Sequence, residues 1–256
     1  MTIPQHFEYL NQYYDKVYIL TLPRLTDRME HCKQILEGLN YEFFYGIDKS
    51  STSILEATQK GIYSKKVYQE FYKKPEEISL GMLCCALGHT KIYESIIKNG
   101  FQKTLILEDD AVPKITSLGY FPQMMRELPT NWELVYLGYE KHEVLDWKAK
   151  INQCFLTLFP HHTQLKLNRK IFSNYYPVNI STHIAKAGFH DCTHAYAVTL
   201  EAAKKLLYLQ QPVKFHPDNL LSYMICTNQL NGYIVQPKLF DQLSAFAHKI
   251  NSMTED

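Results

Sequence analysis

Short apolar runs alternate with helical stretches along this chain, and this alternation constrains its fold more than any other feature. Lys16–Leu22 is an apolar, β-branched run that stops at Pro23, which is typical of a buried strand. An amphipathic helix is predicted next, with Thr26 as its N-cap, and Tyr41–Asp48 is predicted as a second strand. A strand, a helix and a strand in this order favour parallel pairing of the two strands.

The alternation continues toward the C-terminus. Ser79 is the expected N-cap of a long helix that Gly100 ends, and Thr199 is the expected N-cap of a later helix. Further strands are predicted at 103–110, 132–138, 192–199 and 233–242. Short helices and loops are expected over 49–78, whereas 139–190 shows no clear period. The pattern therefore predicts one α/β domain with a mostly parallel central sheet flanked by helices.

Composition excludes several classes of protein. The hydrophobic content of 46% suffices for a core, and a net charge of +1 gives no electrostatic argument for a nucleic-acid partner. The six cysteines form no C-x-x-C pair, so we expect buried thiols in a reducing compartment. Neither a signal peptide nor a membrane-spanning run is recognisable, so a cytoplasmic location is expected, with a peripheral membrane contact left open.

An acidic string is the main candidate for a functional site. The strand predicted at 103–110 runs from apolar residues directly into Glu108, Asp109 and Asp110. Three adjacent carboxylates repel one another and are costly to desolvate, and a divalent cation would offset both costs. Ligands of open α/β sheets collect at the carboxyl ends of strands, where this string is predicted to lie. A solvated acidic turn is the alternative interpretation.

The turn after the first strand is a second candidate. Arg24 and Arg28 stand on either side of Asp27, at the predicted start of a helix. Guanidinium groups bind phosphate in a bidentate manner, and helix N-termini favour anions. Surface salt bridges are the alternative interpretation.

Four other residues are open to two interpretations. His89, on the long helix, fits a structural role better than a catalytic one when it is read alone. His190 and His194 are four residues apart but match no zinc-binding pattern, so a zinc site is not favoured. Asp218 stands at or near a helix start, where an N-cap and a role in the site are compatible.

Seven blocks of sequence, taken in order, resemble glycosyltransferase family 25. This family includes bacterial lipooligosaccharide galactosyltransferases and the collagen galactosyltransferases of animals. The resemblance extends from about residue 15 to about residue 245. The blocks are VYILTLPRLTDR, ISLGMLCCALGHTKIYESI, LILEDDA, ELVYLG, THAYAVTLEAAKKLL, HPDNLL and QPKLFDQ.

The resemblance implies a GT-A fold, a nucleotide-sugar donor that is commonly UDP-galactose, and inverting transfer to a hydroxyl group, usually with Mn²⁺ or else Mg²⁺. Glu108 and Asp110 match the metal-binding positions. Asp218 is the expected general base, with Asp191 as the second choice. The expected donor-binding residues lie near the ends of the first strands, on the long helix and in the acidic string: Leu22, Pro23, Arg24, Asp27, Arg28, Asp48, His89, Glu108 and Asp109.

The chain departs from the family pattern at three positions of the long helix. Met82 replaces a usual Glu, Cys84 a usual Gly and Gly88 a usual Ser. Residues 141–190 match no block and are expected to form a variable, acceptor-side insertion within a single domain of residues 1–256.

The expected function is metal-dependent transfer of a hexose, galactose in the first instance, from a UDP-sugar. The acceptor would be a hydroxyl of a glycan, a lipooligosaccharide or a protein-linked sugar. Two rivals stay open. One is a metal-dependent nucleotide-sugar phosphohydrolase that uses the acidic string with His190 or His194. The other is a catalytically silent binding protein of the same fold, to which Met82 points.

Overall fold

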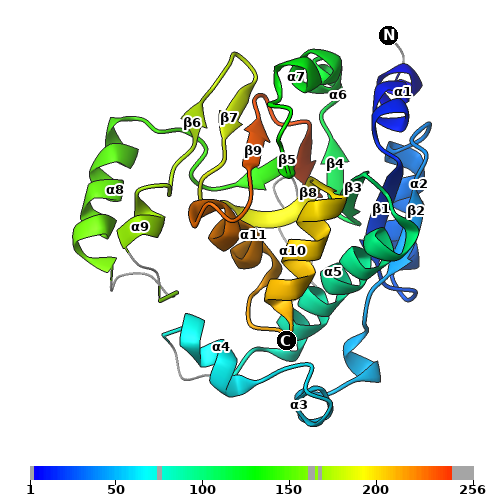
Figure 1. Cartoon of the computed structure of the whole chain (residues 1–256). Helices are drawn as coiled ribbons and strands as arrows, with labels where there is room; N and C mark the ends of the chain where they lie inside the picture. Colours follow the sequence, from blue (N-terminus) through cyan, green and yellow to red (C-terminus); the bar gives the residue numbers. More distant parts are fainter. Residues whose placement is uncertain (1–2, 74–76, 161–164, 167–168, 244–256) are drawn as a thin grey trace.

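An eight-stranded sheet with helices on both faces forms the centre of the molecule (Figure 1). The structure is a computed structural model and describes residues 3–73, 77–160, 165–166 and 169–243. The strands of the sheet are β1 (Lys16–Thr21), β2 (Glu42–Tyr45), β3 (Lys103–Glu108), β5 (Leu134–Glu140), β6 (Val178–Asn179), β7 (Ile184–Lys186), β8 (Asp191–Thr199) and β9 (Gly232–Val235). A two-stranded ribbon is formed by β4 (Ala111–Pro113) and β10 (Phe240–Gln242).

The helices cover both faces of this sheet. They are α1 (Ile3–Tyr13), α2 (Thr26–Ile35), α3 (Ile54–Gln59), α4 (Lys65–Phe71), α5 (Leu80–Asn99), α6 (Ile115–Leu118), α7 (Phe121–Glu127), α8 (Trp147–Leu158), α9 (Arg169–Phe172), α10 (Leu200–Gln210) and α11 (Pro217–Cys226), with a 3₁₀ helix, η1 (Lys49–Ser51). In the described residues, no helix is long and apolar enough to cross a membrane.

The strand order is β2-β1-β3-β8-β5-β9-β7-β6. The strands β1, β2 and β3 pair in parallel, as do β5 and β9, whereas β8 pairs antiparallel with both β3 and β5. Within this sheet β7 and β8 run against the other six strands, so the prediction of a mostly parallel central sheet is confirmed.

The inner strands of the sheet are buried on both faces, which explains why they read as continuous apolar runs. Along β1, Val17 and Ile19 pack into a core beneath α1, α2 and α7, while Tyr18 and Leu20 pack into a second core beneath α5, α10 and α11. Successive side chains of a strand point to opposite faces, and this alternation divides them between the two cores.

Most of the predicted helix ends are confirmed. Ser79 Oγ accepts a hydrogen bond from the backbone N–H of Met82, and Gly100 ends α5 in the left-handed region with φ of 71°. Thr199 caps α10 in the same way as Ser79 caps α5. The prediction for Thr26 is wrong, because Thr26 is the first residue of α2 and Leu25 precedes it without a side-chain cap.

The parallel pairing of β1, β2 and β3 determines where the site forms. Since parallel strands end at the same edge of a sheet, three segments far apart in sequence meet there. These segments are 22–28 after β1, 46–49 after β2 and 108–110 at the end of β3.

Candidate active site

Glu108 is the last residue of β3, and buried groups hold its carboxylate. Its Oε1 accepts hydrogen bonds from Thr193 Oγ1 at 2.5 Å and from His89 Nε2 at 3.3 Å. The other ring nitrogen of His89 bonds to the hydroxyl of Tyr196 at 2.7 Å. Burial acts to raise the pKa of Glu108, but the interactions with His89 and Thr193 outweigh it, so the pKa is lowered and the carboxylate is ionised. His89 therefore positions Glu108.

Asp109 points into the protein. Its two carboxylate oxygens accept hydrogen bonds from Arg28 Nη1 at 2.7 Å and from Thr21 Oγ1 at 2.6 Å, and its side chain has no exposed area. Burial still raises the pKa of Asp109 above its ordinary value, against the effects of Thr21 and Arg28. Both oxygens accept internal hydrogen bonds, so Asp109 joins β3 to β1 and α2. Its contact with the donor stays a prediction.

Asp110 has a free oxygen. Its Oδ2 accepts a hydrogen bond from Gln242 Nε2 at 2.9 Å, whereas its Oδ1 is buried and has no hydrogen-bond partner in the described part of the chain. Burial and the negative charge of Glu108 raise the pKa of Asp110 to about 7. A buried carboxylate oxygen without a donor is costly, and a cation at this point would remove the cost.

The basic residues after β1 have separate partners. Arg24 Nε donates to Asp48 Oδ2 at 2.5 Å, and more than half of the Arg24 side chain is exposed. Asp48 follows β2 and also accepts hydrogen bonds from the backbone and hydroxyl of Ser50, and these bonds, together with Arg24, lower its pKa to about 2. Arg28 is largely buried against Asp109 instead.

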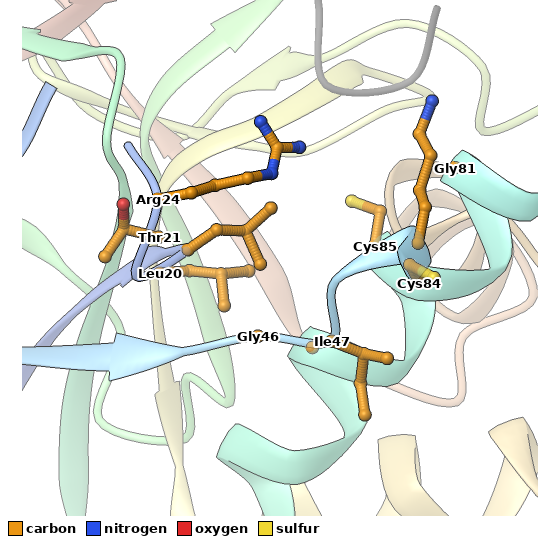
Figure 2. Close-up of a pocket in the computed structure, with 11 residues that line it drawn as sticks. Leu20, Thr21, Arg24, Gly46, Ile47, Gly81, Cys84 and Cys85 are labelled. Carbon is orange, nitrogen blue, oxygen red and sulfur yellow. The ribbon is translucent and has the colours of Figure 1, made fainter. Parts of the chain in front are cut away.

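A pocket lies between the carboxyl ends of β1 and β2 and the first turns of α5 (Figure 2). Arg24 stands across the pocket from Cys84 and Cys85 (Figure 2). Apolar walls with a single guanidinium group suit a flat ring that carries a phosphate. The lining residues are Leu20, Thr21, Leu22, Arg24, Gly46, Ile47, Lys49, Gly81, Cys84, Cys85 and Gly88.

The predicted donor residues divide into two groups. Leu22 and Arg24 line this pocket, and Asp48 holds Arg24. Asp27 and Arg28 line a neighbouring hollow together with Arg24. Pro23, between Leu22 and Arg24, is exposed and lines neither of the two.

Asp218 is the second residue of α11, so it is not the N-cap, which is His216. One of its oxygens accepts a hydrogen bond from the Asn219 backbone N–H at 2.7 Å. Burial and the neighbouring charge of Asp191 raise the pKa of Asp218 to about 6. Asp191, the first residue of β8, forms a salt bridge with Lys141.

Three carboxylates of the site act on the thiol of Cys85, on α5. After burial, the charges of Glu108, Asp218 and Asp110 are the largest influences on this thiol, and all of them raise its pKa. The pKa of Cys192, on β8, is likewise raised by burial and by the charges of Asp218, Glu108 and Asp191. The negative charges at the end of β3, on β8 and on α11 therefore act on thiols of α5 and β8.

The described residues fit a metal that takes few protein ligands. They contain no group of three or more His, Cys, Asp or Glu side chains placed to hold a metal ion. Mn²⁺ and Mg²⁺ accept one or two carboxylates when substrate phosphates and waters complete the shell, and Asp110 Oδ1 with Glu108 supplies such a pair.

The alternative zinc site is not formed. His190 is fully buried, where its Nε2 accepts a hydrogen bond from the Gly188 backbone N–H at 3.0 Å and its Nδ1 pairs with the Lys141 carbonyl at 3.1 Å. Burial lowers the pKa of His190 to about 4. Both nitrogens are used inside the core, so this histidine has a structural role.

Sequence reasoning missed the residues that position the carboxylates. Thr193, Thr21 and Gln242 each donate a hydrogen bond to one member of the acidic string, and they come from three different strands. No local motif marks such residues. The strand period of two does not reach Asp109 and Asp110, because β3 ends at Glu108 and these two residues lie in the turn that follows.

The ion pair of Arg28 and Asp109 leads to a prediction about stability. Replacing Arg28 by Ala leaves a buried carboxylate without its charged partner, so we expect a loss of about 3 kcal/mol in the free energy of unfolding near pH 8. Urea denaturation measures this loss, with the exposed Arg24→Ala variant as the matched control. The loss should shrink as pH falls, because burial raises the pKa of Asp109 and a protonated Asp109 no longer needs a charged partner. An equal loss in both arginine variants would contradict the assignment.

Comparisons with known proteins agree with the family resemblance of the sequence. The family described as "Glycosyltransferase family 25 (LPS biosynthesis protein)" matches residues 14–221. A "Glycosyltransferase 25 family member" of Anopheles gambiae is 26% identical over 78% of this chain, and "Procollagen galactosyltransferase 1-A" of Xenopus laevis is 23% identical over 86%. A "Probable inactive glycosyltransferase 25 family member 3" of Bos taurus is 23% identical over 78%. The chain spans 30–32% of the length of these relatives.

Proposed function

Because this chain belongs to glycosyltransferase family 25, we propose that it transfers galactose from UDP-galactose to a hydroxyl group of a glycan, lipooligosaccharide or protein-linked acceptor. Family membership supports a transferase, and its relatives include proteins named as galactosyltransferases. The helices on both faces of a mostly parallel sheet are those of a GT-A-like glycosyltransferase fold, as predicted. The UDP donor, the metal and the acceptor class are parts of the proposal.

One observation carries the proposal: Asp110 presents a buried, unpartnered oxygen next to the ionised Glu108, at the edge of the sheet where the pocket opens. A Mn²⁺ or Mg²⁺ ion held by Asp110 and Glu108 would neutralise the charge that develops on a diphosphate leaving group. Thr193 and His89 keep Glu108 in place, and Gln242 keeps Asp110 in place, so the pair is ordered before any ligand arrives.

We assign the nucleotide end of the donor to the pocket between β1, β2 and α5. Its apolar lining suits a base, and Arg24, fixed by Asp48, suits the diphosphate. Gly88 allows α5 to approach β1 closely, because a Cβ atom at this position would lie 3.2 Å from Leu20 Cδ1.

Inverting transfer needs a base that removes the proton of the acceptor hydroxyl. The acceptor oxygen forms a bond to the anomeric carbon, the bond from that carbon to the diphosphate oxygen breaks, and Asp218 takes the proton. A pKa of about 6 leaves Asp218 ionised at neutral pH and basic enough for this role.

The departure at Met82 has a structural explanation that favours neither rival. Ser79 is the N-cap of α5, so position 82 is the third residue of the helix, from which a Glu closes a capping box. Met82 keeps the hydrogen bond from its backbone N–H to Ser79 and packs against the core instead. The start of α5 is therefore capped without the usual Glu.

A donor panel tests the proposal. At a hundred times its Kd, a ligand stabilises a protein by about 2.7 kcal/mol, which raises the Tm of a domain of this size by about 5–10 °C. We expect UDP-galactose with Mn²⁺ to give such a shift, UDP alone with Mn²⁺ a comparable one, and GDP-mannose none. Omission of Mn²⁺ should remove most of the shift.

Each outcome of this panel distinguishes the candidates. A shift together with galactose transfer to an added acceptor supports the proposal. Rapid hydrolysis of UDP-galactose without an acceptor would identify the phosphohydrolase, and a shift without any turnover would identify the silent binding protein. Absence of any shift with uridine nucleotides would contradict the donor assignment.

A further inference from the structure

Helix α8 turns an apolar face toward solvent. Trp147, Ile151, Phe155 and Leu158 are 67%, 61%, 42% and 58% exposed, and they constitute what we call the α8 apolar face. Six of the fourteen large hydrophobic side chains that are exposed among the described residues lie within 144–159. Exposed apolar groups are ordinary when they are scattered, but a contiguous set on one helix marks a binding surface.

The opposite face of α8 attaches the helix to the protein. Ala149 and Leu156 are buried, and Gln153 Nε2 donates to the backbone carbonyls of Phe172 and Ser173 at 2.8 and 2.9 Å. Asn152 Nδ2 donates to the Tyr176 hydroxyl at 2.7 Å. At about 100° per residue, the buried residues and the α8 apolar face are centred on opposite sides of the helix. The exposed side is therefore a regular surface of an anchored helix.

Lysines flank the α8 apolar face on both sides. By the same helical geometry, Lys148 lies about 65° to one side of its centre and Lys150 about 95° to the other, and both are exposed. An apolar stripe bordered by basic residues is the pattern of a helix that lies in the surface of an anionic bilayer.

The charge of the surrounding sequence has the same sign. Residues 147–190 contain no Asp or Glu and six basic residues: Lys148, Lys150, Lys166, Arg169, Lys170 and Lys186. This segment therefore carries +6, and since the whole chain carries +1, the remainder carries −5. In Figure 1, α8 lies beside α9 at the outer edge of the molecule, remote from α5 and α10.

We propose that the α8 apolar face, with Lys148 and Lys150, is a docking surface for an anionic lipid bilayer. Charge complementarity favours a bilayer over a second copy of this chain, because two copies would bring like-charged segments together. The surface is also connected to the proposed acceptor side of the site. Helix α8 contacts Tyr176, and Tyr176 packs against His142. The neighbour of His142 in the chain, Lys141, forms the salt bridge with Asp191. Docking here would place acceptors that reside in a membrane beside Asp191 and Asp218.

The inference goes beyond the proposed function and is tested without donor or acceptor. The full chain is mixed with sucrose-loaded vesicles of phosphatidylcholine and phosphatidylglycerol (70:30) and sedimented. Of the two tryptophans, Trp132 is buried and Trp147 is exposed, so insertion of α8 should shift the emission to shorter wavelength. The Trp147→Phe variant should sediment with the vesicles but lose this spectral shift.

Two double variants separate the contributions. Ile151→Gln with Phe155→Gln should weaken partitioning about tenfold or more. Leu55→Gln with Tyr208→Gln, which changes two large side chains elsewhere that are still more exposed, should leave it unchanged. Lys148→Gln with Lys150→Gln should weaken binding to the mixed vesicles about tenfold and leave the weaker binding to pure phosphatidylcholine unaltered. All these side chains are exposed, so circular dichroism and Tm should match those of the unmodified chain.

Three results would overturn the proposal. The first is that the unmodified chain does not sediment with anionic vesicles. The second is that the Ile151/Phe155 double variant binds the vesicles as well as the unmodified chain does. The third is that the chain forms a concentration-dependent dimer and this double variant abolishes it. The last would assign the α8 apolar face to self-association.

Discussion

Replacing Asp110 by Asn should lower the turnover of the proposed metal-dependent transfer by about 10³-fold or more and leave the fold intact. The change removes the negative charge and keeps the shape of the side chain, so Gln242 retains a partner. The unpartnered Oδ1 of Asp110 is the oxygen that we assign to the metal, whereas its Oδ2 accepts the hydrogen bond from Gln242. Turnover at saturating UDP-galactose and Mn²⁺ measures the effect.

The same variant should be more stable than the unmodified protein when no metal is present. The folded state raises the pKa of Asp110 to about 7, from 3.8 for an unperturbed aspartate. Between these values the folded protein binds more protons than the unfolded chain, so this residue lowers stability as pH rises from about 4 to about 7. The Asp110→Asn variant has no charge to bury at this position, so its Tm at pH 8 should exceed that of the unmodified chain. Its Tm shift with Mn²⁺ and UDP should disappear.

A matched control uses Asp241→Asn, which alters a mostly buried carboxylate on β10 that pairs with Lys114. This variant should keep its turnover and its response to Mn²⁺. Normal turnover in the Asp110 variant would remove Asp110 from the metal site, whatever happens to stability.

Replacing Asp218 by Asn should reduce turnover by about 10²–10⁴-fold while the affinity for UDP-galactose stays unchanged. The amide cannot accept the proton of the acceptor hydroxyl, and the pocket that we assign to the nucleotide does not include this residue. Turnover measured with saturating acceptor, together with the Tm shift caused by the donor, separates the catalytic effect from binding.

The pH profile of turnover gives an independent test of Asp218 as the proposed base. Asp218 must be ionised to act, and its pKa is about 6, so turnover should rise with pH up to about 6 and then level off. Asp191→Asn removes a like charge that helps to raise this pKa, so the rise should move to lower pH. An unchanged profile in that variant, or full turnover in Asp218→Asn, would exclude Asp218, and loss of turnover in Asp191→Asn would then favour Asp191.

Local signals predicted the elements of the fold well. The apolar runs, the serine and threonine caps at Ser79 and Thr199, and the left-handed Gly100 each depend on a few neighbouring residues, and the structure contains all of them. The region 139–190 was less predictable. Helix α8 presents most of its large apolar residues to solvent and buries Ala149 and Leu156. A prediction that places the apolar side of a helix against the core would therefore orient this helix wrongly.

The sequence by itself determined the α/β class, the parallel start of the sheet and the position of the acidic string at the end of a strand, because periodicity and capping are properties of adjacent residues. The family resemblance narrowed the function further. Only the tertiary structure decided which carboxylate serves which purpose: Asp109 binds Arg28 and Thr21, Glu108 is held by His89 and Thr193, and Asp110 keeps a free oxygen. The partners of these acids lie on other helices and strands, and a charge acquires its role from the groups that the fold places around it.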